Sequence, residues 1–459
     1  MLAAWLALMA GCASVTPPPD RQVDAPAEWR TAVADSVAVE PQWWMVFGDP
    51  VLTTLVEQAL ANNNDVALAA ARIREARAQE QIARSQLFPA VDAVIDASRS
   101  RAVSALGTPI EATGVRPQVQ VGYELDLFNR IEHQTQAARA TALGVAAAHA
   151  AAQLSVAAAT AASYLTLRAL DARLEIARAT LSSRQEAVRI AGARAASGYT
   201  SELELRQAEA EFAATAALVP QLELAVRRQE NAINVLLDRA PADIARGLAR
   251  IAVPPVPTVL PSELARRRPD IAQAEANIAA ADATLAATRA QFLPQIRLSA
   301  VGGSVYSTLL RNDPITIWSV GMSVLAPIFN AGRTQAQASG AESRRDQAIY
   351  AYRRSVVAAF REVEDALAAI DRLQAQHARV AAQRQALAEV LRHARNRHEA
   401  GYSSYLEQLD AQRALLNSDL TLAQIHGDRL TACVALYQAL GGGWNPADVP
   451  HAGPAGKRP

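Results

Sequence analysis

The sequence has few of the residues that usually mark a metal site or an active site. Four methionines cannot make a Met-rich copper site, and His393 and His398 lie five apart, off one face of a helix. No Gly-rich phosphate loop is present. Basic and acidic residues number 45 each, so there is no charge excess for nucleic acid. We therefore expect no enzyme, no metal, no cofactor and no nucleic-acid partner.

Long apolar runs and bulky side chains are also scarce. Hydrophobic residues reach 51%, but alanine supplies many of them and aromatic residues make up only 5%. This composition is typical of long, closely packed helices rather than of bulky cores. No run of about 18 apolar residues is evident, so no transmembrane helix is expected. Trp43 and Trp44 are expected to fill a core, and Cys433 to be a buried helix thiol.

What the chain does have is an internal repeat. Four landmarks occur twice in the same order, 201 to 205 residues apart, and this indicates a tandem duplication. The pairs are Asp65 with Asp270, Pro89 with Pro294, Phe128 with Phe329, and Tyr199 with Tyr402.

The duplication predicts the organisation of the whole chain. Each repeat holds a helix, a β-hairpin, a long helix and a return helix; in the first repeat the initial helix is expected over Leu55–Leu87. Repeat 1 covers 55–240, with its hairpin at 88–128, long helix at 129–197 and return helix at 202–237. Repeat 2 covers 262–445, with the corresponding elements at 294–329, 330–400 and 404–440. A signal peptide (1–11), a tether and equatorial segment (12–54), an equatorial linker (241–261) and a C-terminal tail (446–459) complete the chain.

The hairpins show the two-residue period of strands with two different faces. Five apolar residues from Val119 to Leu127 alternate with polar or small ones, and the loops are expected at Arg101–Val115 and Gly302–Pro314. Such strands suit either a soluble sheet or a membrane barrel, but no other segment offers a bulky layer to cover the apolar face. About ten residues per strand matches a membrane barrel, with Glu124 and Asp126 facing a wet lumen as an acidic ring.

Four strands are too few to close such a barrel. Closed membrane barrels begin at about eight strands, and an open edge is not tolerated in lipid. We therefore expect several copies of the chain to share one barrel. The long helices, roughly 100 Å each at 1.5 Å per residue, suit either a solvated stalk or the wall of a tube that continues the lumen.

The N-terminus resembles a bacterial lipoprotein signal. An apolar stretch from Leu6 ends in Ala10-Gly11-Cys12, and this resemblance implies cleavage before Cys12 and attachment of lipid to it. The basic start of such leaders is absent, so the true start is expected upstream. An ordinary secretory leader is the alternative. Ala13 after the cysteine is similar to lipoproteins sorted to the outer membrane.

A wider set of motifs resembles the outer-membrane factor lipoproteins of the TolC/OprM/NodT type. The resemblance implies a mainly α, TolC-like fold: a homotrimer with a shared 12-stranded β-barrel over a 12-helix α-barrel of coiled-coil hairpins. It also implies a passive exit duct in the outer-membrane lipid for drugs or other small toxic compounds, working with a periplasmic adaptor and an inner-membrane RND transporter. The motifs are Trp43-Trp44, Phe47-Gly48-Asp49-Pro50, Phe88-Pro89, Tyr123–Phe128, Arg267–Ile271, Pro327-Ile328-Phe329 and Leu409–Arg413.

The same resemblance assigns the periplasmic gate to Leu406, Asp410 and Arg413. Their spacing places all three on one helical face, and Arg413 is expected to pair with a neighbouring helix; an ordinary surface salt bridge is the alternative. The adaptor contacts are expected at the tip turns, Gly198-Tyr199 and Gly401-Tyr402. An exit duct for type I protein secretion and a structural coiled-coil tether remain the alternative functions.

Overall fold

The structure is a computed structural model that describes residues 17–31, 39–247, 250–257, 260–309 and 314–445. The expected signal peptide, Cys12 and the C-terminal tail lie outside the described residues. The chain forms two compact units: residues 1–23, 72–146 and 273–355, and residues 24–71, 147–272 and 356–459. Each unit takes residues from both repeats, so the compact units do not coincide with the repeats.

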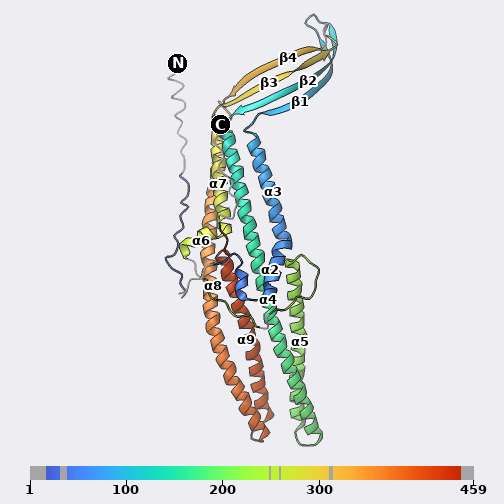
Figure 1. The fold of residues 1–459 in the computed structure, drawn as a ribbon, viewed down its shortest axis with the longest axis vertical. Helices are drawn as coiled ribbons and strands as arrows, with labels where there is room; N and C mark the ends of the chain where they lie inside the picture. The colour runs from blue at the N-terminus through green and yellow to red at the C-terminus, as the bar shows by residue number, and fades with distance from the viewer. Residues whose placement is uncertain (1–16, 32–38, 248–249, 258–259, 310–313, 446–459) are drawn as a thin grey trace. The chain divides into compact units, whose positions relative to one another are not determined.

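The first unit contains one antiparallel sheet in the order β1-β2-β3-β4 (Figure 1). The strands are longer than the expected ten residues and extend into both segments expected to be loops. Antiparallel pairing continues from Ala90 opposite Gly122 to Val103 opposite Pro109, because the ladder satisfies backbone groups whatever the side chains are. The strands are β1 (Ala90–Val103), β2 (Pro109–Leu125), β3 (Gln295–Ser307) and β4 (Ile315–Leu325).

The register places apolar residues of all four strands beside one another on one face of the sheet. Val91 lies opposite Val121, which lies opposite Ala300, which lies opposite Val320. This face is uncovered in the single chain, since Val91 is 65% exposed and Val320 is 76% exposed. Such an apolar surface is unfavourable in water, so the sheet needs an apolar surrounding on this side.

The helix expected from Leu55 to Leu87 is in fact two helices, α2 (Pro50–Asn62) and α3 (Asn64–Ser85). Asn63 lies between them with extended backbone, and its side-chain oxygen accepts a hydrogen bond from the backbone N–H of Asp65 at 2.9 Å. Its amide donates to the carbonyl of Leu236. Asn63 thus ends one helix and caps the next, a role that apolar periodicity does not reveal. The second repeat also has a break between two helices. It lies at Arg268, which has extended backbone, between α6 (Pro261–Arg267) and α7 (Pro269–Ala290).

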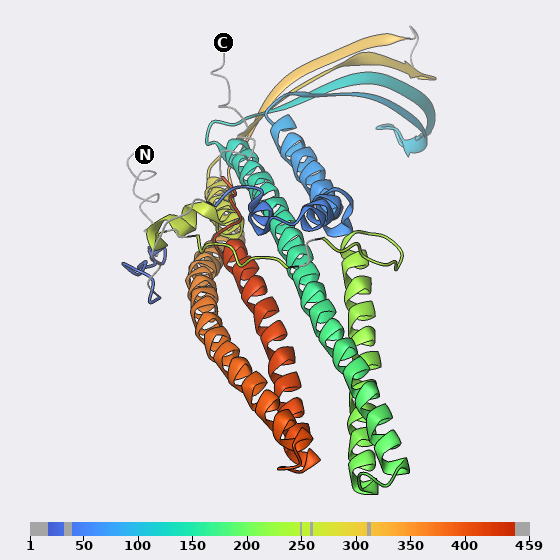
Figure 2. The same ribbon diagram turned by 60° about the horizontal axis from the view of Figure 1, so that its bottom comes forward.

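Two helical hairpins, one from each repeat, extend into the second unit. Figure 2 shows that a tight turn joins the long helix and the return helix of each hairpin. The long helices are α4 (Arg130–Ala196) and α8 (Arg333–Glu399), each of 67 residues, and the return helices are α5 (Glu202–Leu236) and α9 (Tyr405–Ala439), each of 35. One described helix, α4, contains an 18-residue window apolar enough to cross a membrane by length and composition alone. The mild hydrophobicity of many alanines adds up to this window without an unbroken apolar run, and the expected absence of a transmembrane helix stays a prediction.

The core of the second unit includes the aromatic pair of the 3-10 helix η1 (Trp43–Phe47). Trp43 and Trp44 are both buried, which confirms them as core residues, and Trp43 stacks on Tyr437 with ring centroids 5.5 Å apart. Cys433 is buried too, and burial raises the pKa of its thiol to about 11. The thiol is therefore neutral at physiological pH and behaves as an apolar side chain.

Candidate functional site

The three residues expected at the gate lie on α9, near its start. Arg413 donates from Nε to Oε1 of Glu211 on α5 at 2.6 Å, and from an Nη atom to Asp410 at 3.3 Å. Asp410 and Arg413 are therefore joined within α9 and tied, through Glu211, to the other hairpin. Leu406 is exposed on the same helix.

A buried ion pair continues this network into α4. Arg184 and Glu211 are each 6% exposed, and Nη1 of Arg184 lies 2.8 Å from Oε2 of Glu211. The same Nη1 also donates to the backbone carbonyl of Glu211 at 2.8 Å and to the hydroxyl of Thr215. Four charged side chains, Asp410, Arg413, Glu211 and Arg184, thus form one chain of contacts across α9, α5 and α4. We call these four residues the gate network.

The electrostatics of the gate network follow from burial. Burial lowers the pKa of Arg184, and the neighbouring Glu211 opposes that effect. The hydrogen bond to Glu211 raises the pKa of Arg413. Two carboxylates and two guanidinium groups balance in charge, and loss of either Arg184 or Glu211 would leave the other as a buried charge without its partner. All four groups are engaged with one another, and this arrangement suits a fastening between helices.

Sequence reasoning found only the α9 half of this network. Glu211 and Arg184 are ordinary members of a chain with 45 acidic and 45 basic residues, and their spacing in sequence carries no motif. What distinguishes them is burial, which depends on how α4, α5 and α9 pack. The expectation that Arg413 pairs with a neighbouring helix agrees with its contact to Glu211; a gating role remains a prediction.

The two turns at the hairpin ends have the same geometry. The N–H of Gly198 bonds to the carbonyl of Ala195, and that of Tyr199 to the carbonyl of Arg194. Gly401 and Tyr402 repeat both bonds, and the two glycines have φ of 73° and 79°, as this type of helix ending requires. The following tyrosines project into solvent, 84% and 80% exposed. Their expected contact with an adaptor stays a prediction.

Nearby, the two hairpins make a second contact. Nε2 of His398, at the end of α8, lies 3.4 Å from a carboxylate oxygen of Glu204, near the start of α5. The ring of Tyr405 lies against that of His398, with centroids 5.4 Å apart. Among the described residues, no group of three or more His, Cys, Asp or Glu side chains is placed to hold a metal ion.

The two carboxylates expected to line the lumen have other partners in the structure. Asp126 lies beyond the end of β2, and it caps α4 by accepting from the backbone N–H groups of Ile131 and Glu132 at 3.1 and 2.8 Å. The strand position expected for Asp126 is therefore wrong, because the alternating pattern runs past the last paired residue. Glu124 does lie in β2 but is held by Arg130 at 2.8 Å. A lumen position for Glu124, as part of an acidic ring, stays a prediction.

Comparison with known proteins identifies the family. The family model described as outer membrane efflux protein matches residues 55–238 and 260–442. The solvent efflux pump outer membrane protein SrpC of Pseudomonas putida is 35% identical over 462 residues, covering 96% of this chain and 97% of that protein. The pyoverdine export outer membrane protein OpmQ of Pseudomonas aeruginosa is 32% identical, with 95% of each covered.

A solved structure agrees with these matches. The outer-membrane channel OprN superposes with a TM-score of 0.87 at 30% identity, covering 94% of this chain and 99% of that one. The members of this family are channel proteins. The chain therefore belongs to the outer membrane efflux protein family, and it is an outer-membrane exit channel with the TolC-like fold.

Proposed function

We propose that three copies of this chain assemble into the exit duct of a tripartite RND-type efflux pump. The observation that carries this proposal is the four-stranded sheet with its uncovered apolar face. A sheet in lipid must close on itself, since unpaired edge groups are too costly there. One chain supplies four strands, so three chains supply the twelve of a shared barrel.

The helical part suits the wall of a duct rather than a stalk. Within the second unit, the hairpins are held to one another by the gate network and by the contact of His398 with Glu204. A stalk needs no fastening between separate hairpins at their free ends, whereas a closable tube does. We infer that the gate network keeps the ends of the hairpins together, and that separating α9 from α5 opens the periplasmic end.

The cargo is proposed to be small molecules. The two relatives described above are named for solvent efflux and for pyoverdine export, which are chemically different cargoes on similar channels. This favours a passive duct whose cargo is selected by its transporter, and it favours efflux over type I protein secretion. The named transport roles also weigh against a purely structural coiled-coil tether.

Two further parts of the proposal concern attachment and partners. We infer that lipid on Cys12 anchors the chain, because the preceding residues resemble a lipoprotein signal. We also infer that a periplasmic adaptor docks on the exposed turns at Tyr199 and Tyr402, since these protrude at the hairpin ends and bury little within the chain.

The gate is tested by conductance in planar bilayers. The double substitution Asp410→Ala with Arg413→Ala is expected to raise single-channel conductance, because it removes the only members of the gate network that α9 supplies. The matched control is Arg206→Ala with Glu209→Ala, which removes an exposed ion pair within α5 and is expected to leave conductance unchanged. Equal conductance of the gate variant and the unsubstituted protein would contradict the gate.

The assembly is tested separately by native mass spectrometry of protein released from lipid nanodiscs. Three chains per particle are expected. Monomers that nevertheless conduct would overturn the shared barrel.

A further inference from the structure

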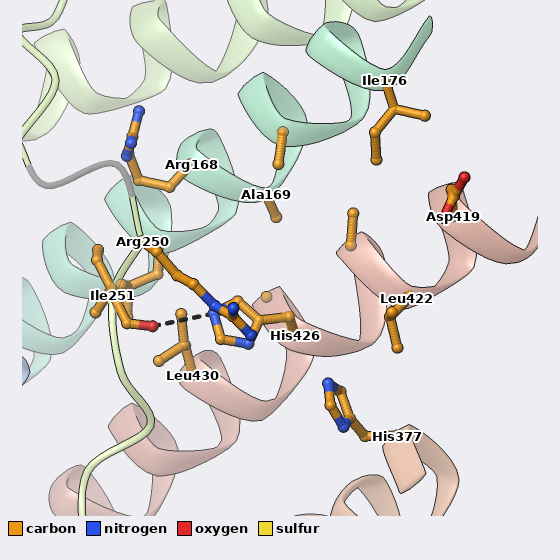
Figure 3. A pocket seen from close by; sticks show the side chains of 14 residues that line it. Arg168, Ala169, Ile176, Arg250, Ile251, His377, Asp419, Leu422, His426 and Leu430 are labelled. Carbon is orange, nitrogen blue, oxygen red and sulfur yellow. Dashed lines mark hydrogen bonds between the residues drawn. The ribbon is translucent and has the colours of Figure 1, made fainter. Parts of the chain in front are cut away.

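The second unit contains a cavity that plays no part in the gate or the barrel. It has a volume of about 320 Å³ and lies among α4, α8, α9 and the linker residues at 250–251 (Figure 3). This volume lies at the lower end of the range of small-molecule sites, about 300–1,000 Å³. The cavity is therefore large enough for one small ligand.

The walls of the cavity are apolar. From α4 it is lined by Leu165, Ala169, Ala172 and Ile176, whose spacing of four, three and four residues forms one helical face. The facing wall on α9 includes Leu422, Ala423 and Leu430. The two helices come very close beside the cavity, because a Cβ on Gly427 would lie 2.5 Å from the Cβ of Ala169. Such walls favour a hydrocarbon or aromatic body.

The polar groups of the cavity come from two arginines, two histidines and one aspartate, and Arg168 is already paired with Asp171 at 3.1 Å. Figure 3 shows Arg250 and His426 side by side with His377 near them, and a ring nitrogen of His426 lies 3.0 Å from the carbonyl oxygen of Ile251. No ion pair links Arg250 to another residue in the described part of the chain. Asp419, which also lines the cavity, is already bound by Arg384 at 2.7 Å.

The positive charges around the cavity help to lower the pKa of both histidines. Burial lowers the pKa of His426, and Arg250, Arg429 and His377 lower it further. The pKa of His377 is lowered by burial and then by Arg429 and Arg250. Arg429 itself donates to the neutral side chain of Gln374, so its charge is not neutralised there. A negative charge at the cavity would offset this repulsion.

We propose that this cavity binds an amphiphilic anion, with its apolar body between α4 and α9 and its anionic group on Arg250 and His377. The apolar walls explain why the body must be hydrophobic, and the guanidinium group of Arg250, which forms no ion pair with the described residues, explains the sign of the head group. The ligand would contact helices of both hairpins. The site is distinct from the gate network, with which it shares no residue.

The proposal is tested by calorimetric titration of the full chain in nanodiscs of zwitterionic lipid, with empty nanodiscs as the background. Decanesulfonate is the probe because its charge does not titrate, decyltrimethylammonium is the matched cation, and inorganic sulfate is the head group alone. One saturable decanesulfonate site per chain is expected, with weak or no binding of the other two. Equal binding of the cation and the anion, or sulfate binding as tightly as decanesulfonate, would overturn the proposal.

Three variants locate the binding. Arg250→Gln, on the exposed linker, is expected to weaken decanesulfonate binding roughly tenfold or more, since a hydrogen bond to a charged group contributes about 1.5–3 kcal/mol. Ala423→Leu fills the cavity and is expected to abolish binding. Arg228→Gln removes another exposed arginine of the same unit, outside the cavity lining, and is expected to change nothing. Unchanged affinity in both Arg250→Gln and Ala423→Leu would rule out this cavity.

Discussion

The two helical hairpins, α4 with α5 and α8 with α9, have equal lengths and the same turns but different charges where they meet. A shift of 203 residues relates each residue of α9 to one of α5 in the first repeat. By this relation Arg413 corresponds to Ala210, and Glu211 corresponds to Ala414. The ion pair between Arg413 and Glu211 therefore joins the two repeats, with one partner from each. Duplication of a backbone does not require duplication of its charges, and the asymmetry gives the two hairpins complementary surfaces.

The largest expected effect comes from removing the acid at the centre of this asymmetry. Glu211→Gln leaves Arg184 buried without its carboxylate and breaks the contact to Arg413, so we expect a loss of about 3 kcal/mol of stability. The measurement is the midpoint of thermal unfolding followed by circular dichroism. Glu209→Gln, whose partner Arg206 lies exposed on the same helix, should cost less than about 1 kcal/mol. Equal midpoints for the two variants would show that burial does not set the strength of this network.

A second difference between the hairpins lies at Gly427 of α9, which corresponds to Leu224 of α5. Gly427→Ala would place its Cβ 2.5 Å from Ala169 on α4, and we expect overpacking to cost about 1–3 kcal/mol. Leu224 is exposed, so Leu224→Ala should be nearly neutral. Thermal unfolding of both variants distinguishes a packed α9 from a solvated α5. A neutral Gly427→Ala variant would mean that α4 moves away at little cost.

A smaller effect is expected from pH, to which the second hairpin contributes His377 and His426, while burial also lowers the pKa of His149 on α4. Because burial lowers the pKa of His426 and His377, the unfolded chain takes up protons first as the pH falls below about 6.5. Stability is fully present above that pH and is lost as the pH falls towards the folded-state values. The double variant His377→Gln with His426→Gln should flatten the dependence of the unfolding midpoint between pH 7.5 and 5. If the double variant keeps the same pH dependence of the unfolding midpoint, other titrating groups cause that dependence.

The smallest effects should be equal in the two hairpins. Gly198 and Gly401 have left-handed backbone and open space where a Cβ would lie, so Gly198→Ala and Gly401→Ala should each cost about 1 kcal/mol through backbone strain alone. The rate of hydrogen exchange of the amides that follow each turn measures local opening of the turn. This rate should rise by the same factor in both variants. Unequal effects would show that the surroundings of the turns differ more than their geometry.

Several features of the fold were predictable because they leave a periodic or repeated signal. Strand alternation from Val119 to Leu127 predicted the apolar face, which the register confirms as far as Leu125, and the duplication predicted the two long helices. The break at Asn63 was not predictable, since it depends on a side chain that caps the following helix and also donates to the distant carbonyl of Leu236. The extended strands were missed because backbone pairing continues through polar residues.

The sequence by itself determined the repeat, the alternating strands, the long helices and the glycine turns, since each of these depends on residues close together in the chain. Only the tertiary structure decided which of the many charged residues are buried together. Arg184, Glu211 and Arg413 meet because three helices bring them within hydrogen-bond distance, and Gly427 lets α9 approach α4 closely beside the cavity at His426. Burial and encounter between distant segments carry no local pattern, so they appear only once the helices are packed.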